Sequence, residues 1–168
     1  PAEIVVEEER RFAAWRAASP RPDRLHYRRR TDNRRQKVGN IEDFCDRWGD
    51  GFDHMIVLDA DSLMAGDSIL RLVRAMERNP TLGILQTLVV GLPSRSAFAR
   101  VFQFGMRHGM RAYTTGSAWW QGDSGPYWGH NAILRMAAFR AHCRLPRLPG
   151  EAPLGGEILS HDQVEAAM

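Results

Sequence analysis

The 168-residue chain is poor in cysteine and has no long apolar run. Its two cysteines, Cys45 and Cys143, form neither a Cys-x-x-Cys pair nor the cysteine and histidine spacing of a zinc site. Cys45 falls on an apolar helical stripe, so we expect a buried, reduced thiol and a cytosolic setting. The longest apolar candidate, residues 84–93, contains Gln86 and Thr87 and is shorter than the ~18 residues that a membrane-spanning helix needs. We therefore expect that this chain does not cross a bilayer.

The sequence also lacks internal repeats and low-complexity tracts. With 43% hydrophobic and 26% charged residues, it has the composition of one soluble globular domain with a core. It begins at Pro1 and ends at Met168 within a predicted helix, so we expect a piece of a longer protein whose targeting signals cannot be read here. The net charge is only +3, but several basic residues cluster and create a local positive field: Arg28, Arg29, Arg30, Arg34, Arg35 and Lys37.

Hydrophobic periodicity predicts alternating helices and strands. Apolar residues at helical spacing, followed by stop signals such as Gly49 and Asn79-Pro80, delimit the helices. The basic run is predicted to be a loop, because Thr31, Asp32 and Asn33 break the periodicity. The alternation of strands and helices after it predicts an α/β fold with a mainly parallel sheet covered by helices. Helices are predicted over residues 3–18, 41–48, 67–79, 97–111 and 136–143 and from Ser160 onward, strands over 25–27, 55–58, 83–87 and 132–135, and a loop over 145–156.

The most informative stretch is residues 55–62, where four apolar residues run directly into Asp59 and Asp61. Ligands in open α/β sheets gather at the carboxyl ends of strands, which is where these two carboxylates are expected. Hard carboxylate oxygens suit Mg²⁺ or Mn²⁺, and such an ion shares its remaining positions with water and phosphates. The alternative is a plain strand followed by an aspartate-capped turn.

Aromatic residues crowd into residues 114–131, among glycines and a proline. Aromatic faces on glycine-rich loops hold sugar rings or bases, but aromatic residues equally serve as core anchors. Both interpretations remain open at this point. The aromatic residues are Trp119, Trp120, Tyr127 and Trp128.

Six stretches in order carry a family resemblance: Tyr27-Arg28-Arg29-Arg30, Lys37-Val38-Gly39-Asn40-Ile41, Val57-Leu58-Asp59-Ala60-Asp61-Ser62, Gly83-Ile84-Leu85-Gln86-Thr87, Tyr127-Trp128-Gly129-His130-Asn131-Ala132 and Leu159-Ser160-His161-Asp162. Together they resemble the family 2 glycosyltransferases, inverting enzymes with a GT-A nucleotide-sugar fold, and more narrowly the branch that makes osmoregulated periplasmic glucans. The resemblance implies a mainly parallel mixed sheet with helices on both faces. It also implies that residues 1–168 are an incomplete catalytic domain.

The resemblance implies a donor site for UDP-glucose. Asp61 would be a metal ligand for Mg²⁺ or Mn²⁺, and Asp59 would be shared between the metal and the donor. Lys37 and Asn40, from the family's Lys-x-Gly-Asn motif, would bind the donor near its diphosphate. A bound cation acts as a Lewis acid on the charge that grows on the diphosphate as the glycosidic bond breaks.

The resemblance also implies an acceptor site for a growing β-glucan. Asp162 matches the general base that removes the acceptor hydroxyl proton, although His161 replaces the family's usual acidic residue. A helix N-cap is the alternative role for Asp162. The stretch Trp128-Gly129-His130 and Gln86 match the acceptor side, while His130 alone is equally compatible with a hydrogen-bonded core histidine.

The same resemblance implies an inner-membrane enzyme whose own transmembrane helices are partners of this segment on the cytosolic face. The family's first donor aspartate and its Gln-x-x-Arg-Trp motif are absent, so we expect the segment alone to be inactive. Three alternatives are a cellulose-synthase-like β-glycan synthase, a nucleic-acid-binding module that uses residues 28–37, and contact of this basic run with anionic lipid. Nucleic acid is not an expected partner, because the pair Asp59 and Asp61 has no role in its binding.

Overall fold

The computed structural model describes residues 2–125, 127–144, 147–151 and 155–156. The chain divides into two compact units, residues 1–34 and residues 35–168. Each unit is described by itself. Within the described ranges, no helix is long and apolar enough to cross a membrane.

The first unit is built on one helix, α1 (Ala2–Ala18), followed by a 3-10 turn, η1 (Pro22–Arg24). The helix confirms the prediction for residues 3–18. The strand predicted for residues 25–27 is wrong, because no strand among the described residues pairs with this segment, which instead lies against the helix. The Tyr27 ring packs on the Phe12 ring with their centroids 5.5 Å apart.

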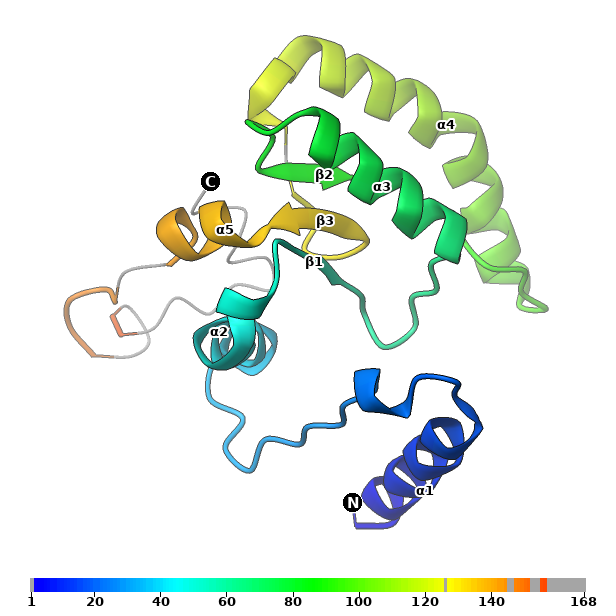
Figure 1. The fold of residues 1–168 in the computed structure, drawn as a ribbon. Helices are drawn as coiled ribbons and strands as arrows, with labels where there is room; N and C mark the ends of the chain where they lie inside the picture. Colours follow the sequence, from blue (N-terminus) through cyan, green and yellow to red (C-terminus); the bar gives the residue numbers. More distant parts are fainter. Residues whose placement is uncertain (1, 126, 145–146, 152–154, 157–168) are drawn as a thin grey trace. The chain divides into compact units, whose positions relative to one another are not determined.

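In the residues that the structure describes, the second unit contains a three-stranded sheet and four α-helices (Figure 1). Helix and strand alternate as the periodicity predicts. The elements are α2 (Gln36–Trp48), η2 (Gly49–Gly51), β1 (His54–Val57), α3 (Gly66–Arg78), β2 (Ile84–Gln86), α4 (Ala97–Gln121), η3 (Gly122–Ser124), β3 (Ala132–Arg135) and α5 (Met136–His142).

Two helices are longer than the sequence predicts. Helix α2 starts at Gln36, so Lys37 lies in its first turn and not in a loop. Helix α4 continues to Gln121 and carries Gly116 in its interior, where a glycine costs only about 1 kcal/mol. Gly122, which has a φ of 55°, ends the helix because a left-handed residue cannot continue it.

The sheet has the order β1-β3-β2, and both pairings are antiparallel. The prediction of a mainly parallel sheet is therefore wrong for the described strands. Strands β1 and β2 run in the same direction, but they do not pair with each other. Strand β3 lies between them, runs in the opposite direction and is hydrogen-bonded to both. Met55 pairs with Leu134 on one side and Ile84 with Leu134 on the other. The local pattern of a strand does not reveal which neighbour it pairs with, or in which direction.

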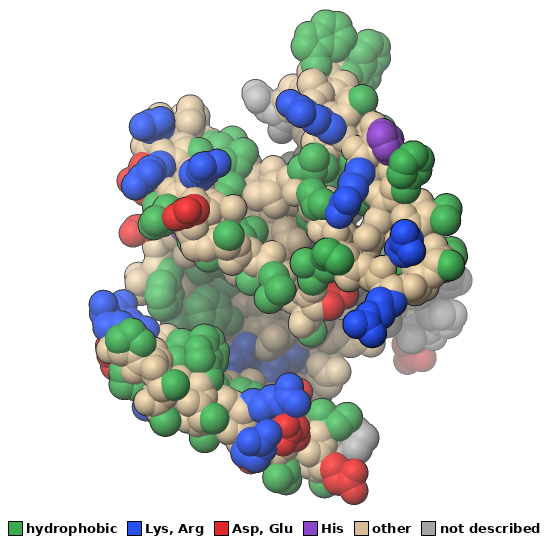
Figure 2. Space-filling model, turned by 90° about the vertical axis from the view of Figure 1, so that its right-hand side faces the viewer, with side chains coloured by type: hydrophobic (Ala, Val, Ile, Leu, Met, Phe, Trp, Pro, Cys, Tyr) green, Lys and Arg blue, Asp and Glu red, His purple; other side chains and the backbone are tan. Residues whose placement is uncertain are grey.

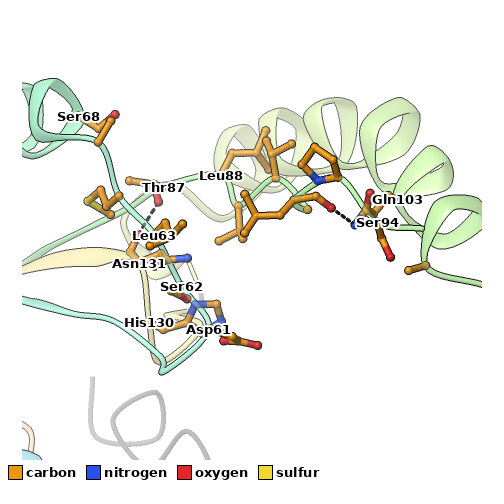
Figure 3. A pocket seen from close by; sticks show the side chains of 18 residues that line it. Asp61, Ser62, Leu63, Ser68, Thr87, Leu88, Ser94, Gln103, His130 and Asn131 are labelled. Atoms are coloured by element: carbon orange, nitrogen blue, oxygen red, sulfur yellow. Dashed lines mark hydrogen bonds between the residues drawn. The ribbon is translucent and has the colours of Figure 1, made fainter. Parts of the chain in front are cut away.

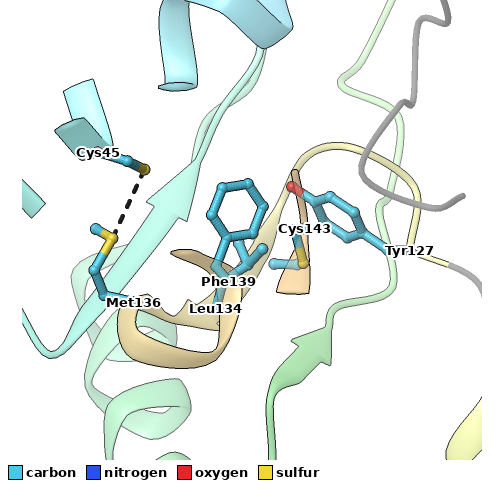
Figure 4. Close-up of a cluster of buried hydrophobic side chains, with 7 residues drawn as sticks. Cys45, Tyr127, Leu134, Met136, Phe139 and Cys143 are labelled. Atoms are coloured by element: carbon cyan, nitrogen blue, oxygen red, sulfur yellow. Dashed lines mark hydrogen bonds between the residues drawn. The ribbon is translucent and has the colours of Figure 1, made fainter. Parts of the chain in front are cut away.

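Helices cover both faces of this sheet, as predicted. Successive residues of β3 point to opposite faces, so Leu134 and Ile133 enter different apolar clusters, and both are fully buried. The first cluster joins the sheet to α2 and α5 (Figure 4): Cys45, Tyr127, Ala132, Leu134, Met136, Phe139 and Cys143. The second joins it to α3: Leu72, Met76 and Ile133.

Both cysteines are buried free thiols in the first cluster, which confirms the prediction for Cys45. Cys45 Sγ lies 3.7 Å from Met136 Sδ (Figure 4). Burial raises the pKa of the Cys45 thiol, and it raises the pKa of the Cys143 thiol to about 11. Both groups are therefore unreactive thiols at neutral pH.

Candidate functional site

The candidate site lies at one edge of the sheet, where β1 and β2 end and β3 begins. The backbone N–H of Asn131, just before β3, donates to the carbonyl of Val57 at 2.8 Å. The carbonyl of Asn131 in turn accepts from the N–H of Thr87 at 3.2 Å. One residue thus ties the end of β1 to the end of β2. Because β3 runs against both neighbours, the segments that follow β1 and β2 meet the segment that precedes β3.

Three charged or titratable side chains meet at this edge. Lys37 Nζ donates to Asp59 Oδ1, and His130 Nε2 lies 3.8 Å from Asp59 Oδ2. About a quarter to a third of each side chain is exposed: 27% for Lys37, 32% for Asp59 and 27% for His130. The cluster is reachable by a ligand, yet its charges are less screened than those of a surface pair.

Lys37 reaches Asp59 from the first turn of α2, because this helix starts at Gln36 and not at residue 41 as the sequence predicts. A lysine in the first turn of a helix is near the positive end of the helix dipole, where a carboxylate or a phosphate is favourable. Asn40, predicted with Lys37 as a donor residue, lies one turn further along α2 in an exposed position. The two residues of the Lys-x-Gly-Asn motif are therefore on one helix, and Lys37 is the one bonded to Asp59.

Gln86 fixes the loop that carries His130. Its Nε2 donates to the carbonyls of His130 and Thr87, each at 3.1 Å, and its Oε1 accepts from the N–H of Trp128 at 3.1 Å. The side-chain amide is thus bonded to protein atoms at both ends. An acceptor-binding role for Gln86 stays a prediction, whereas its role in holding residues 128–131 follows directly from these bonds.

The loop before β3 has an unusual backbone. Gly129 has a φ of 80° and Asn131 a φ of 52°, and both values lie in the left-handed region. Gly129 is buried, and Trp128 and His130 are half-buried. Among the described residues, His130 Nδ1 and Asn131 Oδ1 are buried atoms without a hydrogen-bond partner. Buried polar atoms without a partner cost free energy, and these two belong to residues that line the hollow described below.

The aromatic region of residues 114–131 does not form one platform. Trp119 and Trp120 belong to α4 and are exposed, while Tyr127 is part of the core. Only Trp128 lies in the loop at the sheet edge. The two interpretations of this region thus apply to different residues, with Tyr127 as a core anchor and Trp128 at the candidate site.

A hollow of about 780 Å³ opens beside the cluster. Its walls are residues 61–65, residues 87–94, His130 with Asn131, and the side of α4 that carries Gln103 (Figure 3). Figure 3 shows His130 and Asp61 at the same end of the hollow, with apolar side chains such as Leu63 and Leu88 further along. The hollow therefore combines one polar end with an apolar wall, as ligand pockets commonly do.

Asp59 and Asp61 are the residues that the sequence predicts as ligands of a divalent cation. The N–H of Ser62 donates to the backbone carbonyl of Asp59 at 3.0 Å, so the chain turns after β1, and Asp61, which is exposed, lines the hollow. Asp59 Oδ1 is bonded to Lys37. In the part of the chain that the structure describes, no group of three or more histidine, cysteine or acidic residues lies together as a metal site. Two carboxylates suit Mg²⁺ only if water or phosphate oxygens complete the coordination.

The basic run of residues 28–37 is partly used for internal contacts. Arg34 Nε donates to Asp32 Oδ2 at 2.8 Å, and Arg35 pairs with Glu42. The run is also divided between the two units, after Arg34.

Asp162, the predicted general base, and its neighbour His161 lie outside the described residues.

Sequence reasoning did not assign Thr87 and Asn131 to the site. Thr87 Oγ1 donates to the carbonyl of Asn131, and both residues line the hollow. Their only signal in the sequence is their place beside Gln86 and His130 in the family stretches.

Comparison with known proteins places these residues in a family context. The model of "Glycosyl transferase family 2" matches residues 9–143. The chain is similar to a protein of Bradyrhizobium diazoefficiens named glucans biosynthesis glucosyltransferase H, with 51% identity over 99% of this chain and 22% of that protein. Proteins of the same name from Xylella fastidiosa and Caulobacter vibrioides are 49% and 44% identical over 99% of this chain, and 26% and 25% of their own lengths.

The chain thus spans about a quarter of the length of these relatives. No solved structure matches it.

Proposed function

The chain belongs to glycosyl transferase family 2, and on that basis we propose that it is the nucleotide-sugar-binding part of a glucosyltransferase that extends a glucan with glucose from UDP-glucose. The observation that supports this most is the bonding of Lys37 to Asp59 at the carboxyl end of β1, beside the hollow that Asp61 lines. The name glucans biosynthesis glucosyltransferase H, which relatives at 44–51% identity carry, supports glucose and glucan as the substrates.

The diphosphate of the donor fits the polar end of the hollow. Lys37 and the first turn of α2 supply positive potential there, and Asp61 supplies an exposed carboxylate. Asp61, together with Asp59, would hold Mg²⁺ or Mn²⁺, which when bound supplies Lewis-acid stabilisation of the leaving diphosphate. Lys37 orients Asp59 in the absence of donor and presents its charge to the phosphates when donor is bound.

The acceptor half is proposed from the resemblance. Trp128, Gly129 and His130 would face the glucan, and Asp162 would remove the proton of its attacking hydroxyl, with inversion at the anomeric carbon. Gln86 keeps residues 128–131 in place through the hydrogen bonds described above. In the whole protein we place this segment at the cytosolic face of the inner membrane, next to transmembrane helices of the same chain.

Donor binding is tested by isothermal titration of UDP into the chain in the presence of MgCl2 or MnCl2, and again with EDTA. We expect binding that requires the metal, competition by UDP-glucose but not by GDP, and at least a tenfold loss of affinity in Asp61→Ala. Asp53→Ala is the matched control, since Asp53 is an exposed aspartate just before the opposite, amino end of β1. Its affinity should equal that of the wild type.

Two results would contradict the proposal. One is UDP binding that is unchanged by EDTA and by Asp61→Ala. The other is absence of UDP binding together with oligonucleotide binding that weakens steeply with salt, which would indicate a nucleic-acid-binding module.

A further inference from the structure

The side chain of Asn131 is buried, yet its oxygen makes no hydrogen bond. Among the residues that the structure describes, Asn131 is the only polar or charged one that is buried, with 6% of its surface exposed. Its Oδ1 is a buried atom without a hydrogen-bond partner. Exposed polar groups differ, because water satisfies them, and Figure 2 shows basic and acidic side chains of this kind on the face that it views. A buried, unpartnered oxygen costs free energy and calls for an explanation.

The fold needs the backbone of Asn131 but not its side chain. The backbone N–H donates to the carbonyl of Val57 at 2.8 Å, and the backbone carbonyl accepts from the N–H of Thr87 at 3.2 Å. The φ of Asn131 is 52°, a left-handed value that glycine adopts without steric cost. A glycine at this position would make the same backbone bonds and would bury no unpartnered oxygen. The presence of an asparagine is therefore not explained by the stability of the fold.

The side chain of Asn131 lies on the wall of the hollow. Asn131, His130 and Asp61 all line this space. Figure 3 shows Asn131 between Thr87 and His130, with its amide nitrogen directed into the hollow. The preceding residue also carries a buried polar atom without a partner, His130 Nδ1. Two successive residues thus have unused hydrogen-bonding capacity beside the polar end of the hollow.

We propose that Asn131 is a sugar-recognition residue, whose side-chain amide hydrogen-bonds a hydroxyl group of a glucose bound in the hollow. The inference rests on the proposed function, which places the donor diphosphate at the polar end beside Asp61. The glucose of the donor is bonded directly to the diphosphate, so it lies next to this end, whereas the ribose separates the base from it. A hexose hydroxyl both donates and accepts a hydrogen bond, so it matches either end of an amide. The terminal glucose of a glucan offers the same chemistry, and the experiment distinguishes the two sources.

The test compares the wild type with Asn131→Gly, because glycine keeps the backbone conformation and removes only the side chain. Isothermal titration with MgCl2 or MnCl2 present should show an unchanged affinity for UDP. The affinity for UDP-glucose should fall roughly three- to tenfold, which is the contribution of one neutral hydrogen bond. In a second arm, cellobiose is titrated into the chain saturated with UDP and metal. A loss confined to that arm would assign the recognised glucose to the glucan.

Stability separates recognition from a structural role. The urea midpoint of Asn131→Gly should rise or stay within about 0.3 M of the wild type, because the loss of an unpartnered oxygen and of a positive φ offsets the greater freedom of glycine in the unfolded chain. Asn79→Gly is the matched control for binding. Asn79 is an exposed asparagine at the end of α3, and its carbonyl accepts from Arg135 at the opposite end of β3. It should bind UDP, UDP-glucose and cellobiose as the wild type does.

Three results would overturn the inference while leaving the proposed function intact. The first is an unchanged affinity of Asn131→Gly for both UDP-glucose and cellobiose. The second is an equal loss for UDP and UDP-glucose, which would assign Asn131 to the nucleotide. The third is a fall of about 1 M or more in the urea midpoint, which would assign the side chain to the fold. A wild-type chain that binds no UDP would overturn the proposed function and this inference together.

Discussion

The hydrogen bonds of Gln86 make a sharp prediction about what holds the candidate site together. Gln86→Met keeps the length of the side chain but removes the donor and the acceptor that bind the loop before β3. Three hydrogen bonds at 3.1 Å are lost, and the N–H of Trp128 and the carbonyl of His130 lose a partner. At about 1 kcal/mol for each bond, discounted because Gln86 is half-buried, we expect a loss of about 2 kcal/mol in the free energy of unfolding.

The measurement is urea unfolding of the variant and the wild type. With a slope of about 2 kcal/mol per molar urea, the midpoint should fall by about 1 M. Hydrogen exchange supplies a local readout, because the amide proton of Trp128 bonds to Gln86 Oε1 and should exchange at least tenfold faster in the variant. Gln121→Met, at the exposed end of α4, is the control and should change neither quantity. An unchanged midpoint in Gln86→Met, with Trp128 still protected, would refute the role assigned to Gln86.

Two further predictions concern the core. Ile133→Ala and Leu134→Ala should each cost about 2–5 kcal/mol in urea unfolding, because both side chains are fully buried on opposite faces of the sheet, while Leu63→Ala, at 80% exposed, should cost under about 0.5 kcal/mol. A small loss at either buried position would mean that its face of the sheet is not packed. In alkylation with iodoacetamide at about pH 8, Cys143 should react roughly a hundredfold more slowly in the folded protein than in urea, because a pKa of about 11 leaves little thiolate. Its rate should rise with pH up to that pKa, and equally fast labelling of folded and unfolded protein would show that the thiol is accessible.

The sequence by itself located most elements and the central pair of aspartates. Residues 55–62 combine an apolar strand with a polar end, and this pattern depends only on neighbouring residues. The helices α1, α3 and α5 and the strands β2 and β3 were likewise predicted within a few residues, because their apolar spacing and stop residues are local signals. The stretches that resemble family 2 glycosyltransferases identified Lys37, Gln86 and His130 as candidate site residues, but they did not predict which residues these side chains contact.

Only the tertiary structure decided how these pieces meet. Lys37 and Asp59 are 22 residues apart in sequence, and Gln86 and Trp128 are 42 apart. Their contacts exist because β3 enters between β1 and β2 and runs against both, which no local pattern specifies. Composition and periodicity depend on neighbouring residues, whereas a site depends on which distant residues the sheet brings to one edge.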